Sequence, residues 1–498
     1  MTFLKFIDIF NQWKQYCIFR NTQKYKCLSV YTEQHSKGLI ALLTYNNKKN
    51  LLELRKYQYG LQDVSEPNLY RDNFNYDEVP KVTFNYRLVP MNCPDEIWIT
   101  DTTFRDGQQS RAPYSTEQIV KLYDMMHRLG GPKGKIRQCE FFLYSENDRK
   151  AIRACQELGY EFPEITGWIR ATKEDFQLVK DMGLKECGIL VSCSDYHIFH
   201  KLHKTRKQAM DSYLEIVEAA LDMGIRPRCH FEDVTRADFY GFVVPFSQEL
   251  HRLMEKYQIP VKIRFCDTMG YGVPYPGATL PRSVPGIIYG IHHFGQFPSE
   301  LIEWHGHNDF YKAVVNATTA WLYGASSINC SLLGIGERTG NTPLEAMVME
   351  YAQIRGTLDG MDPTVITEIA EYYEKELDYA IPSRTPFVGS DFNVTRAGIH
   401  ADGIAKDEEI YNIFNTAKIL NRPLGVEINK NSGLAGIAYW LNHELKRNDN
   451  QKFDKNAKEV AILKDWVDKQ YDHGRVSYIS KEELLEAVQE LIPHIFQP

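Results

Sequence analysis

Two histidines separated by one residue, His305 and His307 in the segment HGHND, are the residues most suited to metal chemistry. Side chains alternate along a strand with a period of two, so both imidazoles face the same side if this segment ends a strand. Asp106, in the segment DTTFRDGQQ, offers a carboxylate. Two imidazoles and one carboxylate suit a divalent cation such as Mn²⁺, Mg²⁺, Co²⁺ or Zn²⁺ and leave about three positions of an octahedral ion open. The alternative is a pair of hydrogen-bonded core histidines.

A second period-two row occurs in the segment PRCHFED, where Arg228, His230 and Glu232 should share one face. Burying charges is costly unless they are used, and an arginine in such a place can bind a carboxylate with two parallel hydrogen bonds. The alternative is an internal salt bridge between Arg228 and Glu232. Arg170 is a second candidate for binding a carboxylate. The alternative is that Arg170 lies in a loop and is solvated.

The segment GIGERTGNTPLE, which includes Asn341, combines glycines with the start of a predicted helix. Glycines let the backbone approach a ligand closely, and the amides that open a helix can bind an anion. The motif therefore indicates an anion site, and by itself it is a weak signal.

Short apolar runs that alternate with amphipathic helical stretches must position these residues. Eight such runs occur between Glu96 and Gly334, at residues 96–101, 136–142, 164–169, 187–192, 227–233, 261–267, 301–307 and 326–334. Eight strand–helix repeats predict an α/β fold, a (β/α)8 TIM barrel, and chemistry at the carboxyl ends of its strands. An open doubly wound sheet would usually carry a glycine-rich loop after its first strand, which is missing here. Asp106 and the two histidines lie at the carboxyl ends of strands one and seven, both odd, so they can converge.

The whole chain divides into four segments. Residues 1–57 hold 10 Lys/Arg against 3 Asp/Glu, which marks a basic N-terminal extension without a readable motif. Residues 58–94 are rich in proline and read as an irregular lead-in, residues 95–355 as the catalytic barrel, and residues 356–498 as helical C-terminal subdomains.

Composition excludes several classes of protein. The formal net charge of -7 argues against a nucleic-acid-binding protein. No apolar run approaches the roughly 18 residues of a membrane span, and the N-terminus lacks a signal-peptide core. The ten cysteines form no C-x-x-C pair, which is typical of reduced thiols in a cytoplasmic protein. We therefore expect a cytoplasmic enzyme with no membrane or nucleic-acid partner.

Taken together, DTTFRDGQQ, HGHND and GIGERTGN, on strands one, seven and eight, resemble the metal-dependent acyl-CoA synthases and lyases, the HMG-CoA lyase-like family. That family includes isopropylmalate, homocitrate, citramalate and Re-face citrate synthases. The segment AGIHADG is similar to a motif that follows the barrel in the synthases. The resemblance implies condensation of acetyl-CoA with a 2-oxo acid, Mn²⁺ as the expected metal with Co²⁺, Mg²⁺ or Zn²⁺ as alternatives, and a homodimer with shared active sites.

The resemblance also implies roles for matching positions. Asp106, His305 and His307 match the metal ligands, and Arg105 matches the arginine beside the reacting carbonyl. The remaining matches are the active-site glutamate Glu140, the carboxylate-binding Thr268, the asparagine of the glycine motif Asn341, and His400, which reaches a neighbouring subunit, with Tyr411 as a candidate to join it there.

Departures from the family pattern favour a dicarboxylic substrate. Phe310, Tyr311 and Lys312 replace the small apolar residues that usually follow HND, and EFFLYS replaces a segment like EAGFP. Arg228 matches the position that holds a second carboxylate in homocitrate synthases, and too few residues follow the barrel for a leucine sensor. The whole pattern is most similar to Re-face citrate synthases, which implies oxaloacetate, with homocitrate, isopropylmalate and citramalate synthases as alternatives.

The resemblance sets the expected mechanism as well. His400 of a partner subunit is the expected base for the methyl group of acetyl-CoA, and Glu232 is the alternative. Arg105 is expected to stabilise negative charge on an oxygen. A lyase, a biotin-dependent carboxyltransferase and a non-catalytic scaffold are the rival interpretations, and the intact GERTGN and HND segments favour a synthase.

Overall fold

A computed structural model describes residues 43–46, 51–54, 58–396, 398–445, 447, 451–477 and 479–496. The chain divides into two compact units, residues 1–59 and 60–498. In the first unit, strands β1 (Leu43–Asn46) and β2 (Leu51–Leu54) pair as an antiparallel hairpin. The rest of the basic extension predicted for residues 1–57 lies outside the described residues.

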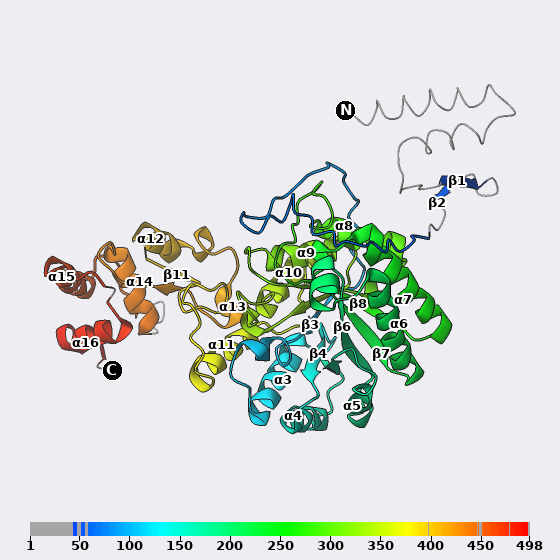
Figure 1. Ribbon diagram of the computed structural model, residues 1–498. Coiled ribbons are helices and arrows are strands. Elements are labelled where there is room, and N and C mark those ends of the chain that lie inside the picture. The colour runs from blue at the N-terminus through cyan, green and yellow to red at the C-terminus, as the bar shows by residue number, and fades with distance from the viewer. Residues whose placement is uncertain are drawn as a thin grey trace. The chain divides into compact units, whose positions relative to one another are not determined.

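The second unit contains a closed barrel of eight parallel strands, which confirms the predicted fold (Figure 1). Each strand pairs with the next along the chain, and the last pairs with the first. In order, the strands are β3 (Trp98–Asp101), β4 (Ile136–Phe142), β5 (Glu164–Ile169), β6 (Glu186–Ser192), β7 (Arg226–Glu232), β8 (Lys262–Asp267), β9 (Ile302–Gly306) and β10 (Ser327–Cys330).

A helix follows each barrel strand, so the strands lie within a layer of helices. These helices are α3 (Thr116–Gly130), α4 (Glu146–Glu157), α5 (Phe176–Asp181), α6 (Arg206–Asp222), α7 (Val244–Tyr257), α8 (Val284–Gly290), α9 (Ala313–Tyr323) and α10 (Leu344–Arg355). Several have strong start signals in the sequence. In α3 and α6, Ser115 and Thr205 form capping boxes with Gln118 and Gln208, which satisfy backbone amides that would otherwise lack a partner.

Apolar and charged side chains alternate along the barrel strands. On β7, Phe231 stacks against Phe246 of α7, with ring centroids 5.2 Å apart, so it faces the helical layer. The neighbouring Arg228 and His230 are also buried, but they contact Glu140 of β4 across the barrel interior. The outer face of the strands therefore forms an apolar core with the helices, while the inner face is a network of charges.

The C-terminal region is mainly helical, as predicted. It contains α11 (Thr364–Glu376), β11 (Val394–Thr395), α12 (Gly398–Lys406), α13 (Thr416–Leu420), β12 (Gly425–Val426), α14 (Leu434–Glu444), α15 (Lys458–Asp472) and α16 (Lys481–Leu491). Helix α11 is tied to α3 by an ion pair between Arg128 and Glu368, with 2.7 Å between Nη2 and Oε2. Helices α14, α15 and α16 share a second apolar core that includes Leu441, Leu463 and Val488. Among the described helices, none is long and apolar enough to cross a membrane.

The lead-in segment before the barrel is irregular, and a buried arginine anchors it. Arg206, at the start of α6, makes two hydrogen bonds of 2.8 and 2.7 Å to Asp195 and one of 3.0 Å to Asp238. Its Nη1 also donates to the carbonyl of Gln62 at 3.0 Å. Asp195 accepts a hydrogen bond from the backbone amide of Asn68 at 2.7 Å. One fully buried guanidinium thus joins the lead-in to the barrel.

Replacing Arg206 with Leu should lower the free energy of unfolding by about 3–5 kcal/mol, because it leaves two carboxylates without their cation. Urea unfolding followed by circular dichroism measures this. Lys207→Met is the matched control, since the Lys207 side chain forms an exposed pair with Asp211 and its loss should change the free energy of unfolding by less than about 1 kcal/mol. Equal stability of the two variants would contradict the anchoring role.

Candidate metal centre and active site

The three residues predicted as metal ligands converge at the carboxyl ends of the strands. Asp106 follows β3, His305 lies in β9, and His307 comes directly after β9. One ligand atom of each lies within 4.8 Å of the other two. The Nε2 atoms of His305 and His307 are 3.3 Å apart, and Asp106 Oδ2 lies 3.8 Å from the first and 4.0 Å from the second. All three side chains are buried.

The chemistry of this cluster fits a divalent cation. Burial lowers the pKa of His305 to about 3 and also lowers the pKa of His307, so both offer neutral imidazoles with a lone pair. Burial alone would raise the pKa of Asp106, but Arg105 and the other neighbouring groups together outweigh burial and hold that pKa below its usual value. Asn341 donates to Asp106 Oδ2 at 2.8 Å, and its own Oδ1 is buried without a hydrogen-bond partner in the described chain. Two lone pairs and a carboxylate that face one another suit a divalent cation.

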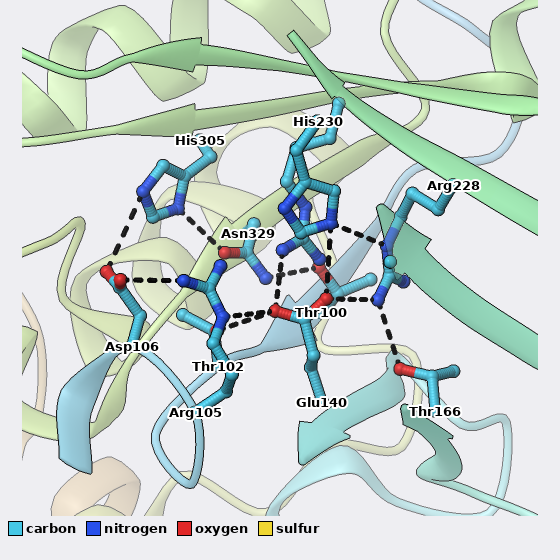
Figure 2. Close-up of polar contacts among 12 residues, drawn as sticks. Thr100, Thr102, Arg105, Asp106, Glu140, Thr166, Arg228, His230, His305 and Asn329 are labelled. Carbon is cyan, nitrogen blue, oxygen red and sulfur yellow. Dashed lines mark hydrogen bonds and ion pairs between the residues drawn. The ribbon is translucent and has the colours of Figure 1, made fainter. Parts of the chain in front are cut away.

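Arg105 connects the cluster to the barrel interior (Figure 2). Its Nη1 donates to Asp106 Oδ1 at 2.8 Å, and its Nε donates to Glu140 Oε2, also at 2.8 Å. The guanidinium lies over the ring of Trp168, 5.4 Å from the ring centroid. Arg105 is therefore held beside the candidate metal ligands, and its positive charge lies next to them.

Glu140, on β4, is the centre of the buried network. Its pKa lies well below the usual value although burial opposes this, because Arg264 and Arg105 stabilise the carboxylate. It therefore acts as an acceptor and not as a proton donor. Its hydrogen-bond and ion-pair partners are Thr102, Arg105, Arg228, His230 and Arg264.

Arg228 and His230 lie deeper in the barrel than the metal-binding residues. Arg228 donates to Glu140 at 2.5 Å, to Glu186 of β6 at 2.9 Å and to Thr166 of β5 at 3.1 Å. Its guanidinium thus bonds acceptors inside the barrel. Glu232 is not among these partners, so the alternative of a salt bridge between Arg228 and Glu232 is wrong. Burial lowers the pKa of His230 to about 3, so its imidazole is neutral beside Glu140.

A glycine on β6 makes room for this part of the network. A Cβ atom on Gly188 would lie 2.7 Å from Nε2 of His230 and 2.8 Å from Oε1 of Glu140. Both distances are shorter than a non-bonded contact allows. The absence of a side chain at this position therefore lets Glu140 and His230 approach each other.

Glu232 belongs to a separate group at the end of β7. It accepts a hydrogen bond from Ser192, and its carboxylate lies 2.9 Å from Nδ1 of His197 and 3.2 Å from Nζ of Lys201. Burial alone would raise the pKa of Glu232, but the hydrogen bond to His197 helps to lower it to about 2. Such a carboxylate is charged at neutral pH and is a weak base.

The glycine motif closes the barrel mouth beside Thr268. Arg338, within the motif, donates to the carbonyl of Thr268 at 2.6 Å and pairs with Asp309 at 2.8 Å. The Thr268 hydroxyl accepts the amide of Asp233 at 2.9 Å. A Cβ atom on Gly340 would lie 2.2 Å from the carbonyl oxygen of Gly334, so the turn that places Asn341 next to Asp106 requires glycine.

A cavity of about 710 Å³ lies against this motif. Arg111 contributes to its wall and stacks on Tyr114, 3.9 Å from the ring centroid, while its buried Nη1 has no hydrogen-bond partner within the described ranges. Backbone amides and a cation around a cavity suit an anionic ligand. The full lining comprises Ser110, Arg111, Leu333, Gly334, Ile335, Gly336, Glu337, Arg338, Thr339, Gly340 and Tyr379.

Besides Glu232, three of the predicted site residues lie away from the cluster. The side chain of Arg170 is 68% exposed and lies near Asp175 and over the ring of Tyr144. His400 and Tyr411 lie against each other in the C-terminal region, with ring centroids 4.4 Å apart, and both are exposed. In the described chain, no hydrogen bond or ion pair joins these three residues to the metal-binding side chains.

Three buried residues that contact the site were missed from the sequence. Asn329 accepts a hydrogen bond from Nδ1 of His305 at 2.8 Å, and Arg264 and Glu303 extend the network around Glu140. The period-two pattern that selected Arg228 and His230 also places Arg264 of β8 and Glu303 of β9 on the inner face. Applied to every strand, the same rule would have found them.

Comparison with known proteins agrees with this geometry. A family model described as HMGL-like matches residues 96–372. The chain is 60% identical over 441 residues to a protein of Clostridium kluyveri named Citrate (Re)-synthase, covering 89% of this chain and 97% of that protein. It is 56% identical over 455 residues to the Citrate (Re)-synthase of Syntrophus aciditrophicus, covering 91% of this chain and 72% of that protein.

A more distant relative has a different product. The chain is 39% identical over 437 residues to the 2-phosphinomethylmalate synthase of Streptomyces hygroscopicus, covering 86% of this chain and 98% of that protein. All of these alignments extend well beyond the barrel strands, and the family match spans more than half of the chain. The chain therefore belongs to the HMGL-like family.

Proposed function

We propose that this protein is a citrate synthase of the Re-face type, which converts acetyl-CoA, oxaloacetate and water to citrate and CoA. The observation that carries the proposal is the 60% identity to a Citrate (Re)-synthase over 97% of that protein's length. The cluster of Asp106, His305 and His307 supports it, because such donors suit a divalent cation, and a divalent cation can bind the carbonyl and carboxylate of a 2-oxo acid.

Asp106, His305 and His307 are the residues that would hold the cation, which we propose to be Mn²⁺. When bound, it would polarise the carbonyl and adjacent carboxylate of the 2-oxo acid as a Lewis acid. The other groups belong to the chain itself. Arg105 is held by Asp106 and Glu140 with its positive charge at the cluster, and so it can stabilise the oxygen that gains negative charge during condensation.

In the proposed reaction, a base removes a proton from the methyl group of acetyl-CoA. The resulting carbanion forms a bond to the 2-oxo carbon of oxaloacetate, whose carbonyl oxygen becomes a hydroxyl group after gaining a proton. Water then hydrolyses the thioester and releases CoA. We assign the base to His400 of a partner subunit rather than to Glu232, because the low pKa of Glu232 makes it a weak base.

Thr268 and Asn341 line the barrel mouth at the height of the cluster, where the carboxylate beside the 2-oxo group would bind. We propose that the second carboxylate of oxaloacetate reaches toward His230 and Arg228. Arg228 would then exchange part of its contact with Glu140 for the substrate. The exposed Arg170 is the alternative. Acetyl-CoA would enter by the cavity against the glycine motif, where Arg111 has a donor to spare for an anionic group.

Exposed apolar side chains around His400 support a homodimer. Ile399 is 74% exposed, Ile413 is 96% exposed, and Tyr411 is about half exposed. Such a patch is unfavourable in water and is typical of a surface that another chain covers. A partner that covers this patch would bring His400 into a second active site.

Together with the buried free thiols, the soluble substrates favour a cytoplasmic location.

A thiol-release assay with acetyl-CoA tests the proposed reaction directly. We expect turnover with oxaloacetate, formation of citrate, and little turnover with 2-oxoglutarate, pyruvate or 2-oxoisovalerate. A chelator should abolish activity and Mn²⁺ should restore it. His305→Ala should also be inactive, whereas His200→Ala, at an exposed histidine, should not. Turnover only with 2-oxoglutarate or 2-oxoisovalerate would replace the citrate assignment by that of a homologous synthase.

The position of the second carboxylate is tested by two arginine variants. Arg228→Lys keeps the charge that Glu140 and Glu186 need but loses the fork of parallel donors. It should raise the KM for oxaloacetate by about 10-fold, the equivalent of one strong hydrogen bond, and leave the KM for acetyl-CoA unchanged. Arg170→Gln is the control and should change neither value much. The reverse pattern would assign the second carboxylate to Arg170.

The shared active site is tested by Ile413→Glu, which places a charge in the apolar patch. Sedimentation velocity should show a shift from dimer to monomer, and turnover should fall with it because His400 no longer reaches its partner. Val476→Glu is the matched control, since Val476 is equally exposed on another part of the C-terminal region. A fully active monomer would rule out the shared site.

A further inference from the structure

Asn329, on β10, lies between the metal-binding residue His305 and the first barrel strand. In the strand register, Asn329 is aligned with His305 of β9 on one side and with Thr100 of β3 on the other. Its Oδ1 lies 2.8 Å from Nδ1 of His305, and its Nδ2 lies 3.0 Å from the hydroxyl of Thr100 (Figure 2). The Thr100 hydroxyl in turn bonds Glu303. Asn329 is fully buried, and Thr100, Glu303 and His305 are at most 4% exposed.

Glu303, Thr100, Asn329 and His305 thus form a row of hydrogen bonds. The direction of each bond in this row follows from the end at Glu303. Glu303 is paired with Arg264, and a carboxylate beside a guanidinium only accepts hydrogen bonds. Thr100 must therefore give its single hydroxyl proton to Glu303, so its oxygen can only accept from Asn329. The amide NH₂ of Asn329 is thereby turned toward Thr100, and its carbonyl oxygen is turned toward His305.

A carbonyl oxygen 2.8 Å from an imidazole nitrogen requires a proton on that nitrogen. His305 thus carries its proton on Nδ1, and its Nε2 keeps the lone pair. That Nε2 faces Asp106 and His307. The opposite orientation of the amide would place NH₂ against Nδ1, move the proton to Nε2 and remove the lone pair from the cluster.

We propose that Asn329 is a positioning residue of the metal centre, which fixes His305 in the Nδ1–H tautomer through a row that begins at Arg264. The inference rests on the proposed metal site and adds a residue to it that does not touch the cation. Partners of this kind orient a metal-binding histidine, and their loss typically weakens metal affinity by about 10- to 100-fold. The orientation of His305 thus depends on Arg264 of β8, which is four side chains away along the row.

Titration of the metal-stripped full chain with MnCl₂ in a calorimeter tests the proposal without relying on turnover. Asn329→Leu, which removes the acceptor, should weaken Mn²⁺ binding about 10- to 100-fold. Asn329→Asp, which keeps an acceptor at the same place, should restore most of the affinity. Thr100→Val leaves Asn329 intact but frees its amide to turn, so it should produce a smaller loss in the same direction.

Asn316→Leu is the matched control, because Asn316 is also buried and its amide donates to a backbone carbonyl at 3.0 Å, that of Gly272. It should lower the melting temperature without changing Mn²⁺ affinity. If Asn329→Leu does not fold, the comparison of Thr100→Val with the conservative Thr100→Ser decides the question.

Two outcomes separate this inference from the proposed function. Failure of the wild-type chain to bind Mn²⁺ would refute the metal centre and this inference together. Tight binding by the wild type and equally tight binding by Asn329→Leu would refute the inference alone. If Asn329→Leu does not fold, Mn²⁺ binding by Thr100→Val as tight as that of the wild type and of Thr100→Ser would refute the inference.

Discussion

A carboxylate buried in a barrel is stable only when cations compensate for the lost water, and Glu140 contacts three guanidinium groups, those of Arg105, Arg228 and Arg264. Each of these arginines also bonds a second carboxylate, on Asp106, Glu186 and Glu303 respectively. The charges thus alternate through the interior and nearly balance. Because removing one member of such a network leaves its neighbours unpaired, the arrangement is fixed as a unit.

This alternation connects parts of the site that are far apart in the sequence. One branch runs through Arg105 to Asp106 and reaches the metal-binding cluster from the side of β3. Another runs through Arg264 and Glu303 and reaches His305 from the side of β10. Both sides of the cluster are therefore held by groups that depend on the same carboxylate. A site built in this way is organised before substrate binds, which is what charge stabilisation during a reaction requires.

Local patterns were enough to predict the barrel, its eight strands and the three residues of the candidate metal cluster. The eight apolar runs and the H-x-H spacing depend only on neighbouring residues, and the strand register then brings Asp106 and His305 together. The partners of Arg228 could not be predicted in this way, because they come from β4, β5 and β6, and sequence spacing does not say which inward side chains lie at the same depth. The orientation of Asn329 depends on a row of hydrogen bonds across four strands, β8, β9, β3 and β10. The role proposed for His400 could not be derived from local patterns either, because it requires a second chain of the proposed homodimer.

The missing side chain at Gly188 has a consequence for how this barrel can change over evolutionary time. The nearest atoms to an added methyl group would belong to His230 and Glu140, and Glu140 is the carboxylate on which Arg105 and Arg264 depend. A substitution as small as alanine on β6 would therefore act on Arg105, which follows β3, and on Arg264 of β8, neither of which it touches. Exposed residues such as Arg170 and Tyr311 are free of this constraint, whereas the buried network around Glu140 can change only by several replacements made together.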